Sequence, residues 1–403
     1  MSTTATLATD VDLTDPAFVA DPYPVLADLR ALGPVVRHEA RGTWLATSHA
    51  SVSAVLRDRA FGRVWTDHEP AAQMAPFNAL HRHQMMENEP PQHTRLRRLV
   101  AGAFGRGHVE RMRPRVHALT TRLLDEFDGP VVDVVGAYAE PLPVLVIADL
   151  LGVPGEDHEL LRDWSQAIVR MYEHDVDAPT RDAAVAASTA FSDYVRAFVA
   201  ERRGDPRDDL VTDLIAATDE GGRLSEDELV ASVVLLLNAG HEASVNAFGN
   251  GLAALLARPD QLARVTSGEV PVAVALEELL RFDAPLQLFE RTCLRDTEVL
   301  GTPVAAGETV ACLMGSANRD EAVFAAADEL DVARDPNPHV GFGMGVHFCL
   351  GAPLARLELQ ISLGELLDRH PDLRATAHAP RRPTFVLRGL EHLDVTLTGG
   401  PHP

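Results

Sequence analysis

The residue best suited to chemistry in this sequence is a cysteine at the end of a glycine-punctuated loop. Cys349 lies in the segment FGMGVHFCLG, residues 342–351, directly ahead of an apolar, helix-forming run over residues 352–367. Glycines let a backbone pass close to a flat molecule. A helix start behind the sulfur offers free N–H groups and a positive dipole end, which favour thiolate over thiol. A thiolate held in this way is suited to ligating a haem iron from one face.

Two interpretations of Cys349 compete, and the residues around it decide between them. A free cysteine is often a small, buried and inert core residue, so the cysteine alone would not indicate a haem ligand. Here six residues occur together in order: Phe342, Gly343, Gly345, His347, Cys349 and Gly351. This pattern resembles the haem-binding loop of the cytochrome P-450 family, and the resemblance extends from Asp21-Pro22-Tyr23 to Gly389-Leu390.

That resemblance implies a fold, a cofactor and a reaction. The fold is mainly α with a smaller β-rich region, in one domain over residues 1–403, with a long central helix over the haem. The cofactor is haem b, with Cys349 as the thiolate ligand of its iron, and thiolate donation favours O–O bond cleavage. The implied enzyme is a monooxygenase, an oxidoreductase. It uses O2 and two electrons to hydroxylate or epoxidise a secondary metabolite, with a polyketide or macrolide and a cyclic peptide as the expected types.

The resemblance also bears on partners and on alternatives. No flavin or ferredoxin module is fused within the 403 residues, so electrons are expected from a separate ferredoxin and its reductase. Arg95, Arg98 and Arg356 are candidates for the docking surface. The alternatives on the same scaffold are oxidative coupling of substrate radicals, a peroxide-driven peroxygenase, and a non-catalytic haem-thiolate binder. Activity with hydrogen peroxide but not with reduced ferredoxin would indicate the peroxygenase, and ligand-induced spectral change without product would indicate the binder.

Composition narrows the partners and the compartment. The chain is 46% hydrophobic, and its formal charge of 36 − 59 = −23 disfavours nucleic acid and anionic membrane surfaces. Three unpaired cysteines argue against a disulfide framework and for a reducing compartment. Residues 1–15 lack the features of a signal peptide, and no uninterrupted apolar run of about 18 residues exists. With the resemblance, this predicts a soluble bacterial protein, cytoplasmic and monomeric, without a membrane anchor.

The hydrophobic patterning predicts a large helical body and a smaller strand-rich part built from both ends. Apolar periodicity predicts helices over residues 21–32, 93–104, 109–127, 142–151, 160–172 and 183–202. Ser225-Glu226-Asp227-Glu228 is a capping box that opens an apolar run to Leu256, stopped by Arg258-Pro259. A run this long, apolar nearly all round, is expected to cross the interior. Short strands are expected within residues 35–38, 41–46, 286–300, 302–314 and 384–397.

Four cationic or imidazole side chains match a second feature of the family. His93 and Arg97 are four residues apart on a predicted helix and therefore project together. They match the segment whose His and Arg bind the haem propionates, and Arg291 and His347 match two further propionate partners. Taken singly, each could be an exposed charge. A dianionic cofactor edge buried in protein needs such cations, so four matches in register indicate a ligand role.

A structural role is implied for Glu278, Arg281 and Arg334. Glu278 and Arg281 are three residues apart on one helix face, which alone would be an ordinary surface salt bridge. Their order with Arg334 resembles the family helix whose Glu and Arg lock with a downstream arginine under the haem. The trio is therefore expected to hold the cysteine loop in place and to take no part in the chemistry.

The long helix carries the clearest departure from the family pattern. Ala239, Gly240 and Glu242 match the oxygen-binding helix, where a small-residue pair makes room above the iron and an acid follows. Threonine is expected next, but this sequence has Ala243 and then Ser244. Splitting O2 requires two protons, delivered through a hydroxyl or ordered water in a dry pocket. Ala243 has no hydroxyl to offer.

Three explanations of this departure stay open. The first is water positioned by the substrate's own hydroxyl or carbonyl, since some family members acting on macrolide precursors show a similar Ala-Ser pair. The second is Ser244 itself, after a local helix distortion, because it otherwise points about 100° away round the helix. The third is less usual chemistry, such as ring coupling. Glu242 could be only a satisfied helix acid, but a carboxylate in so apolar a segment is costly, and we predict a proton-pathway role.

Substrate contacts are expected at positions that the resemblance places around the pocket. Residues 77–86 would form a mobile lid. The predicted contacts are Leu236, Ala239, Ala243, Gln287, Leu288, Phe289 and Leu390. Apolar side chains at these positions are equally consistent with plain core packing.

Overall fold

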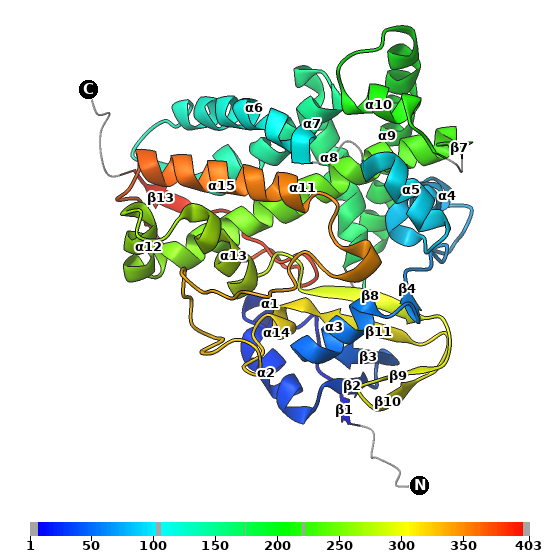
Figure 1. Cartoon of the computed structure of the whole chain (residues 1–403), viewed down its shortest axis with the longest axis horizontal. Helices are drawn as coiled ribbons and strands as arrows, with labels where there is room; N and C mark the ends of the chain where they lie inside the picture. The colour runs from blue at the N-terminus through cyan, green and yellow to red at the C-terminus, as the bar shows by residue number, and fades with distance from the viewer. Residues whose placement is uncertain (1–6, 102–105, 174, 220–221, 398–403) are drawn as a thin grey trace.

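The computed structural model describes residues 7–101, 106–173, 175–219 and 222–397 of the chain. Most of its elements form a helical body, and a smaller β-rich part lies below that body in Figure 1. The mainly α fold predicted from the sequence is confirmed. The helices are α1 (Pro16–Ala20), α2 (Tyr23–Leu32), α3 (His49–Arg57), α4 (Ala75–His83), α5 (Gln92–Ala101), α6 (Arg106–Asp125), α7 (Pro141–Leu151), α8 (His158–Val169), α9 (Ala178–Gly204), α10 (Leu210–Ala216), α11 (Glu226–Leu256), α12 (Pro259–Thr266), α13 (Val272–Phe282), α14 (Met314–Ala317) and α15 (Ala352–Arg369). Shorter helical turns are η1 (Met85–Glu87), η3 (Val135–Ala139), η4 (Gly155–Asp157), η5 (Arg170–Tyr172) and η6 (Gly345–His347).

The largest sheet in the described residues joins the N-terminal strands to strands that follow α13. Its order is β1-β2-β3-β11-β8-β4, and β11 connects the two halves because it pairs in parallel with β3 and antiparallel with β8. The strands are β1 (Ala8–Thr9), β2 (Val35–His38), β3 (Thr43–Ala46), β4 (Phe61–Gly62), β5 (Val131–Asp133), β6 (Thr218–Asp219), β7 (Gly222–Arg223), β8 (Leu288–Cys293), β9 (Thr297–Val299), β10 (Thr302–Val304), β11 (Thr309–Leu313), β12 (Arg374–Ala375) and β13 (Asp394–Thr396).

A short strand is present within the C-terminal range 384–397, as predicted, but it occupies only the end of that range. Of residues 384–397, only Asp394–Thr396 forms a strand, in a separate sheet with β5 and β12. The backbone N–H groups of residues 385–387 donate instead to the carboxylate of Glu173, at 3.0 to 3.2 Å. A side chain thus takes the place of a neighbouring strand and holds this segment as a turn.

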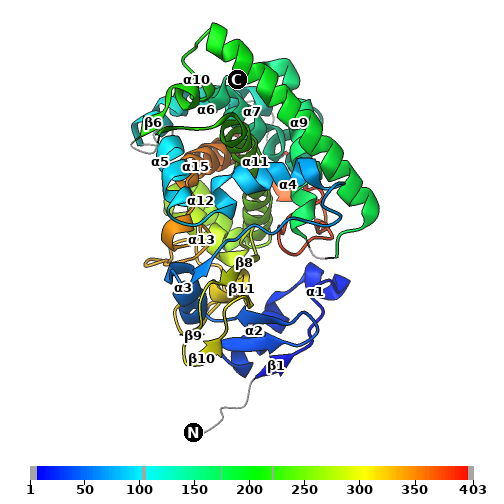
Figure 2. The ribbon, with the colours of Figure 1, turned by 90° about the vertical axis from the view of Figure 1, so that its right-hand side faces the viewer.

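Helix α11 is the central element of the body, as predicted. Ser225 and Glu228 form the expected capping box, and the helix runs for 31 residues. Figures 1 and 2 show it inside the helical body, where it packs against α7, α13 and α15. Among the described residues it is the one helix long and apolar enough to span a membrane, but 83% of that apolar window is buried inside the protein, as in a core helix.

Other predicted helices are confirmed with shifted ends. Helix α9 starts at Ala178, five residues before the predicted start, because the side chain of Asp177 accepts from the N–H of Thr180 and caps it. Helix α8 ends at Val169 and continues as the turn η5 to Tyr172. Helix α5 covers the predicted range up to Ala101, and residues 102–105 lie outside the described part.

Candidate functional site

The cysteine loop is a tight turn directly before helix α15. The Cys349 N–H donates to the Phe342 carbonyl oxygen at 2.9 Å, which closes the loop. Gly343 and Gly345 have φ angles of +69° and +70°, in the left-handed region that favours glycine. A Cβ on Gly345 would also collide with the carbonyl oxygen of Leu56 in α3. The glycines therefore let the loop turn back and pack against α3.

The surroundings of the Cys349 sulfur combine burial with positive charge. Burial raises the pKa of the thiol, whereas hydrogen bonds from the backbone of Gly351 and Ala352 and the charge of Arg97 lower it. These N–H groups belong to the start of α15, where the helix dipole also favours an anion. A thiolate is the form of cysteine that ligates metals. The loop thus presents a half-buried cysteine whose sulfur a metal cation would hold in its ionised form.

Two of the predicted propionate partners are in ring contact, and a third fastens the loop. The rings of His93 in α5 and His347 in the cysteine loop have centroids 4.4 Å apart. Arg97 donates to the Phe348 carbonyl oxygen at 2.7 Å, which fastens α5 to the loop. Burial, His347 and Arg97 lower the pKa of His93 to about 4. Its Nδ1 atom is buried without a hydrogen-bond partner in the described part of the chain, so this nitrogen is free to bind another polar group.

Arg291, the fourth predicted partner, is a buried cation without a counter-ion. It lies on β8 and is 4% exposed. Its guanidinium donates to the Glu290 carbonyl oxygen at 2.9 Å and packs on the Phe289 ring at 4.5 Å, and no carboxylate in the described residues pairs with it. Burial lowers its pKa to about 10. A buried guanidinium without a direct ion-pair partner is costly. Glu87 and Glu89 act on Arg291 only through space, so an anion in direct contact would stabilise it.

Glu89 and Arg63 belong to the same cluster and were not predicted. The Glu89 carboxylate accepts from His347 Nε2 and from the Arg63 backbone N–H, both at 2.7 Å. Burial alone would raise the pKa of Glu89, but these hydrogen bonds hold it below its ordinary value. The Arg63 side chain pairs with Glu87 and packs on the Phe289 ring at 4.3 Å. No spacing in the sequence signals this cluster, because its members are brought together by the fold.

The tight packing of α11 is interrupted at its predicted oxygen-binding segment. Ala239 is exposed, and Gly240 and Ala243 are half-buried, although residues 229–238 before them and 244–252 after them are buried. In a helix that crosses the core, exposed small residues mark space for another molecule. The helix is regular through these positions, so the local distortion that would turn Ser244 into this space is not present.

These observations fit the haem that the sequence implies. Cys349 can ligate iron, since it lies half-buried at a helix start. Arg291 and the unpartnered His93 nitrogen can bind the propionates, because both lack protein partners. Ala239 and Gly240 leave room beside α11.

Glu242 has one oxygen in an ion pair and one without a partner. Its Oε1 accepts from Arg382, which also donates to Glu140 Oε1 at 2.7 Å. Its Oε2 is buried without a hydrogen-bond partner in the described residues. Burial raises the pKa of this carboxyl, and the Arg382 charge opposes that rise. A carboxyl with a raised pKa can hold a proton and release it.

A buried cluster of ion pairs joins Glu278 to Arg281 and Arg334. Both Glu278 and Arg281 are 0% exposed, and Arg281 donates twice to Glu278, at 2.7 and 2.8 Å. Arg334 Nε donates to both Glu278 oxygens, at 3.0 and 3.1 Å. The backbone of Asp331 and the side chain of Asn337 also donate to Glu278. Every polar atom of this carboxylate is therefore engaged.

The predicted substrate contacts lie in more than one place. Leu236 and Leu390 belong to the large apolar cluster of the helical body. Gln287, on the other hand, donates to the Tyr23 hydroxyl at 3.2 Å, and Leu288 packs among the N-terminal helices. Phe289 lies beneath the two arginines of the propionate cluster. The structure does not bring Gln287 and Leu288 together with Leu236, and the substrate roles of the whole set stay predictions.

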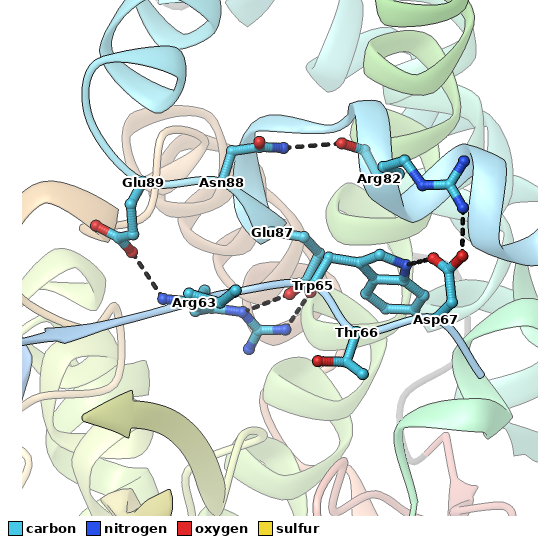
Figure 3. A pocket seen from close by; sticks show the side chains of 9 residues that line it. Arg63, Trp65, Thr66, Asp67, Arg82, Glu87, Asn88 and Glu89 are labelled. Carbon is cyan, nitrogen blue, oxygen red and sulfur yellow. Dashed lines mark hydrogen bonds and ion pairs between the residues drawn. The ribbon is translucent and has the colours of Figure 1, made fainter. Parts of the chain in front are cut away.

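A cavity of about 530 Å³ opens beside the propionate cluster. Figure 3 shows the Arg63–Glu87 and Arg82–Asp67 pairs around it, with Glu89 at one end. The residues predicted as a lid, 77–86, form most of α4 and the start of η1. The cavity is lined by Arg63, Val64, Trp65, Thr66, Asp67, Arg82, Glu87, Asn88 and Glu89.

Glu358 is a further buried acid that was not predicted. It lies on α15, is 4% exposed, and burial raises its pKa to about 8. No arginine pairs with it in the described part of the chain. Its only signal in the sequence is an acid inside an apolar helix.

The fold and this site together define the class of protein, a haem-dependent oxidoreductase. The sequence model of the family described as Cytochrome P-450 matches residues 272–371. The chain is 40% identical over 387 residues to nocardicin C N-oxygenase of Nocardia uniformis subsp. tsuyamanensis, covering 93% of this chain and 96% of that protein. It is 37% identical over 390 residues to the monooxygenase PikC of Streptomyces venezuelae, covering 94% and 91%. The solved structure of PksS, from the bacillaene polyketide synthase of Bacillus subtilis 168, has a TM-score of 0.88 at 33% identity and covers 96% and 100%.

The chain therefore belongs to the cytochrome P-450 family. Membership makes it an oxidoreductase of the monooxygenase class that uses haem iron and O2 and acts on small molecules with redox partners.

Proposed function

We propose that this protein is a monooxygenase with a Cys349-ligated haem b, which hydroxylates or epoxidises a secondary metabolite of the polyketide or macrolide type. The observation that carries the proposal is the buried Arg291 without a counter-ion, in one cluster with His93 and His347. A dianionic propionate edge is the partner that suits it. When bound, the haem-thiolate supplies the activation of O2 with two electrons. We further propose that residues 1–403 act as one domain and as a cytoplasmic monomer.

The chain's own residues position the groups and supply the protons. Ala239 and Gly240 leave room at α11, and the apolar side chain of Leu236, three residues before Ala239 on the same helix, keeps that space dry. Glu242 holds a proton on Oε2 and releases it beside Ala243. Because Ala243 has no hydroxyl, the last transfer passes through water held by the substrate's own hydroxyl or carbonyl group. The regular geometry of α11 favours this explanation over a relay by Ser244.

The electron donor is proposed to be a separate ferredoxin with its reductase, docking on the face of the cysteine loop. Val346 and Phe348 are 37% and 40% exposed there. Arg356 lies beside them and pairs with Glu277, whereas Arg95 is already bound to Glu228. Arg356→Glu is therefore expected to slow reduction by ferredoxin without changing reduction by dithionite. An unchanged ferredoxin-driven rate would remove this face as the docking surface.

The substrate class is supported by the relatives and by the departure at Ala243. PksS is named for a polyketide synthase, and nocardicin C N-oxygenase for the oxidation of a nocardicin. Both names describe secondary metabolites. A polyketide carries the hydroxyl and carbonyl groups that a substrate-assisted proton relay requires.

The proposal is tested by optical spectroscopy of the purified protein. The reduced, carbon-monoxide-treated wild type is expected to absorb at about 450 nm, the signature of a thiolate-ligated haem. Cys349→Ser should abolish that band, whereas Cys293→Ser, at a buried cysteine outside the loop, should keep it. A band that survives Cys349→Ser would refute the assignment.

Screening of metabolites by the spin-state shift of the bound haem then identifies the substrate. Product formed with reduced ferredoxin and O2 supports a monooxygenase. Product formed with hydrogen peroxide alone would instead identify a peroxide-driven enzyme, and spectral shifts without any product would identify a binder.

A further inference from the structure

A second cavity lies where the N-terminal helices α1 and α2 meet the helical body (Figure 1). Its volume is about 620 Å³, within the range of small-molecule sites. None of the residues that line it belongs to the cysteine loop or to the predicted haem and substrate contacts. Four of them are arginines, namely Arg258, Arg319, Arg381 and Arg388. In a chain with a formal charge of −23, this is a local concentration of positive charge.

The carboxylates that pair with these arginines do not balance them. Asp283 is 5% exposed and is shared, because Arg381 Nη2 donates to one of its oxygens at 2.6 Å and Arg388 Nε to the other at 2.9 Å. Although burial would raise the pKa of this carboxyl, Arg381 and Arg388 lower it to about 2. Asp328 pairs with Arg319 at 2.9 Å, but its side chain is 60% exposed. The buried groups of the cavity therefore carry an excess of positive charge.

Arg258 adds a cation that has no ion-pair partner in the described residues. It lies between α11 and α12, is half-buried, and donates through Nη1 to the Ala254 carbonyl oxygen at 3.2 Å. Burial and the neighbouring charge of Arg319 lower its pKa, and Asp260 opposes this only through space. Two guanidinium groups that face one cavity repel each other. An anion bound between them would therefore stabilise both.

Aromatic rings hold these two guanidinium groups in place. The guanidinium of Arg319 lies 3.8 Å from the centre of the Phe282 ring and 4.1 Å from the centre of the Tyr23 ring. The guanidinium of Arg258 packs on the same Phe282 ring at 4.6 Å. Such contacts are attractive and fix the side chains. A ligand that binds there has little side-chain freedom to remove, which lowers the cost of binding.

Unused hydrogen-bond donors remain on two of the arginines. A guanidinium has five N–H groups. Within the described residues Arg258 uses one of them, and Arg381 uses two, through Nη1 to Asn250 Oδ1 at 2.6 Å and through Nη2 to Asp283. The free donors belong to separate parts of the chain, before α12 and between β12 and β13. Guanidinium groups match phosphate oxygens, and a tetrahedral phosphoryl group suits donors that arrive from several directions.

We propose that this cavity is a binding site for a phosphoryl group, either of free phosphate or of a small phosphate ester. Arg258 is its principal ligand, and Arg319 and Arg381 support it. Asp21 also lines the cavity but is exposed, so water and salt screen its charge more than the charges of the buried arginines. The site is separate from the haem contacts, and the inference does not depend on the proposed function.

The test is a calorimetric titration of the purified protein with inorganic phosphate and with glycerol 3-phosphate, at fixed ionic strength and with glycerol as the uncharged control. At about pH 7.5 both probes carry close to two negative charges. The wild type is expected to bind one phosphoryl group per chain, and Arg258→Gln should weaken this binding at least about tenfold. Arg122→Gln, which removes the same charge from an exposed position on α6, should bind like the wild type. Asp328→Asn removes a negative charge from the cavity and should tighten binding.

The two probes also distinguish the sources of the phosphoryl group. Tighter binding of glycerol 3-phosphate supports a phosphate ester, and tighter binding of inorganic phosphate supports the free ion. A crystal soaked in the tighter probe should show its phosphoryl group in contact with Arg258. Equal affinities of Arg258→Gln and Arg122→Gln would overturn the proposal, as would the absence of saturable binding of either probe to the wild type. These results need no turnover and are distinct from a wild type without the band at about 450 nm, which would refute the proposed function alone.

Discussion

Two buried glutamates on two helices of this protein are each paired with arginine, yet their surroundings differ. Glu278 on α13 is 0% exposed and accepts hydrogen bonds from Arg281, Arg334, Asn337 and the backbone of Asp331. Glu242 on α11 is 7% exposed, pairs with one arginine through Oε1, and leaves Oε2 without a partner in the described residues.

The difference separates a carboxylate that supports structure from one that is equipped for chemistry. A buried charge with all its hydrogen bonds made is fixed in one state, because any change leaves several partners unpaired. A carboxyl with a free oxygen and a raised pKa can change its protonation at little cost to its surroundings. Both residues are buried glutamates. What distinguishes them is how many of their carboxylate oxygens have a hydrogen-bond partner.

The largest effect is expected from removing Glu278, the carboxylate whose two oxygens both accept hydrogen bonds. Glu278→Ala leaves Arg281, which is 0% exposed, and Arg334 without their anion. Breaking a buried pair in this way costs about 3–5 kcal/mol, and we expect a protein that is purified without haem. Glu277→Ala is the matched control. This neighbouring acid is half-buried and pairs with Arg356 and His339, so its loss should cost less than the loss of the fully buried Glu278. Equal haem content in the two variants would break the comparison.

The second prediction concerns Glu242, whose Oε2 has no hydrogen-bond partner in the described residues. Glu242→Gln keeps shape and burial but cannot release a proton, so the protein should fold, bind haem and retain its carbon monoxide band. With a substrate found by the spin-state screen, the fraction of electrons that ends in product should fall by a factor on the order of 100. Hydrogen peroxide should accumulate in its place. Glu140→Gln, which changes the outer partner of Arg382, should have the smaller effect, and full coupling in Glu242→Gln would place the proton source elsewhere.

A third buried acid, Glu358, has no arginine partner in the described residues and extends the comparison. Burial raises the pKa of Glu358 to about 8, whereas an unfolded chain ionises near the ordinary glutamate value. Between those two pKa values the unfolded state loses its proton and the folded state keeps it, so stability falls with rising pH until about pH 8. Glu358→Gln removes this dependence. The variant should match the wild type at pH 4 and exceed it by roughly 1–4 kcal/mol at pH 8 in denaturant unfolding. A constant difference across this range would mean that Glu358 is ionised in the folded protein.

The contrast also explains which parts of the molecule the sequence could predict. The capping box at Ser225 and Glu228 is set by residues three apart, and the structure contains it. The cysteine loop is equally local. The pair of Glu242 with Arg382 joins residues 140 positions apart, and that of Glu89 with His347 joins residues 258 apart. Such contacts depend on how helices pack, so an arginine or glutamate at those positions carries no signal of its partner.

The extent of the strand within residues 384–397 could not be predicted for the same physical reason. Its β-like pattern is a local preference, but the N–H groups of residues 385–387 are bound by Glu173, more than two hundred positions away. Local patterns therefore predicted the helices. The hydrogen-bond partners of individual carboxylates could be identified only in the packed structure.

The smallest expected effect tests the relay beside Glu242. Ala243→Thr restores the hydroxyl of the family pattern at a half-buried position. If a substrate group already positions the water, the added methyl and hydroxyl should disturb binding, with a change of a fewfold, about 1 kcal/mol, in kcat/KM. If the relay is only incomplete, coupling should be retained or improve. A large gain in turnover on the identified substrate would therefore contradict substrate assistance, and it would show that Glu242 lacks only its neighbour's hydroxyl.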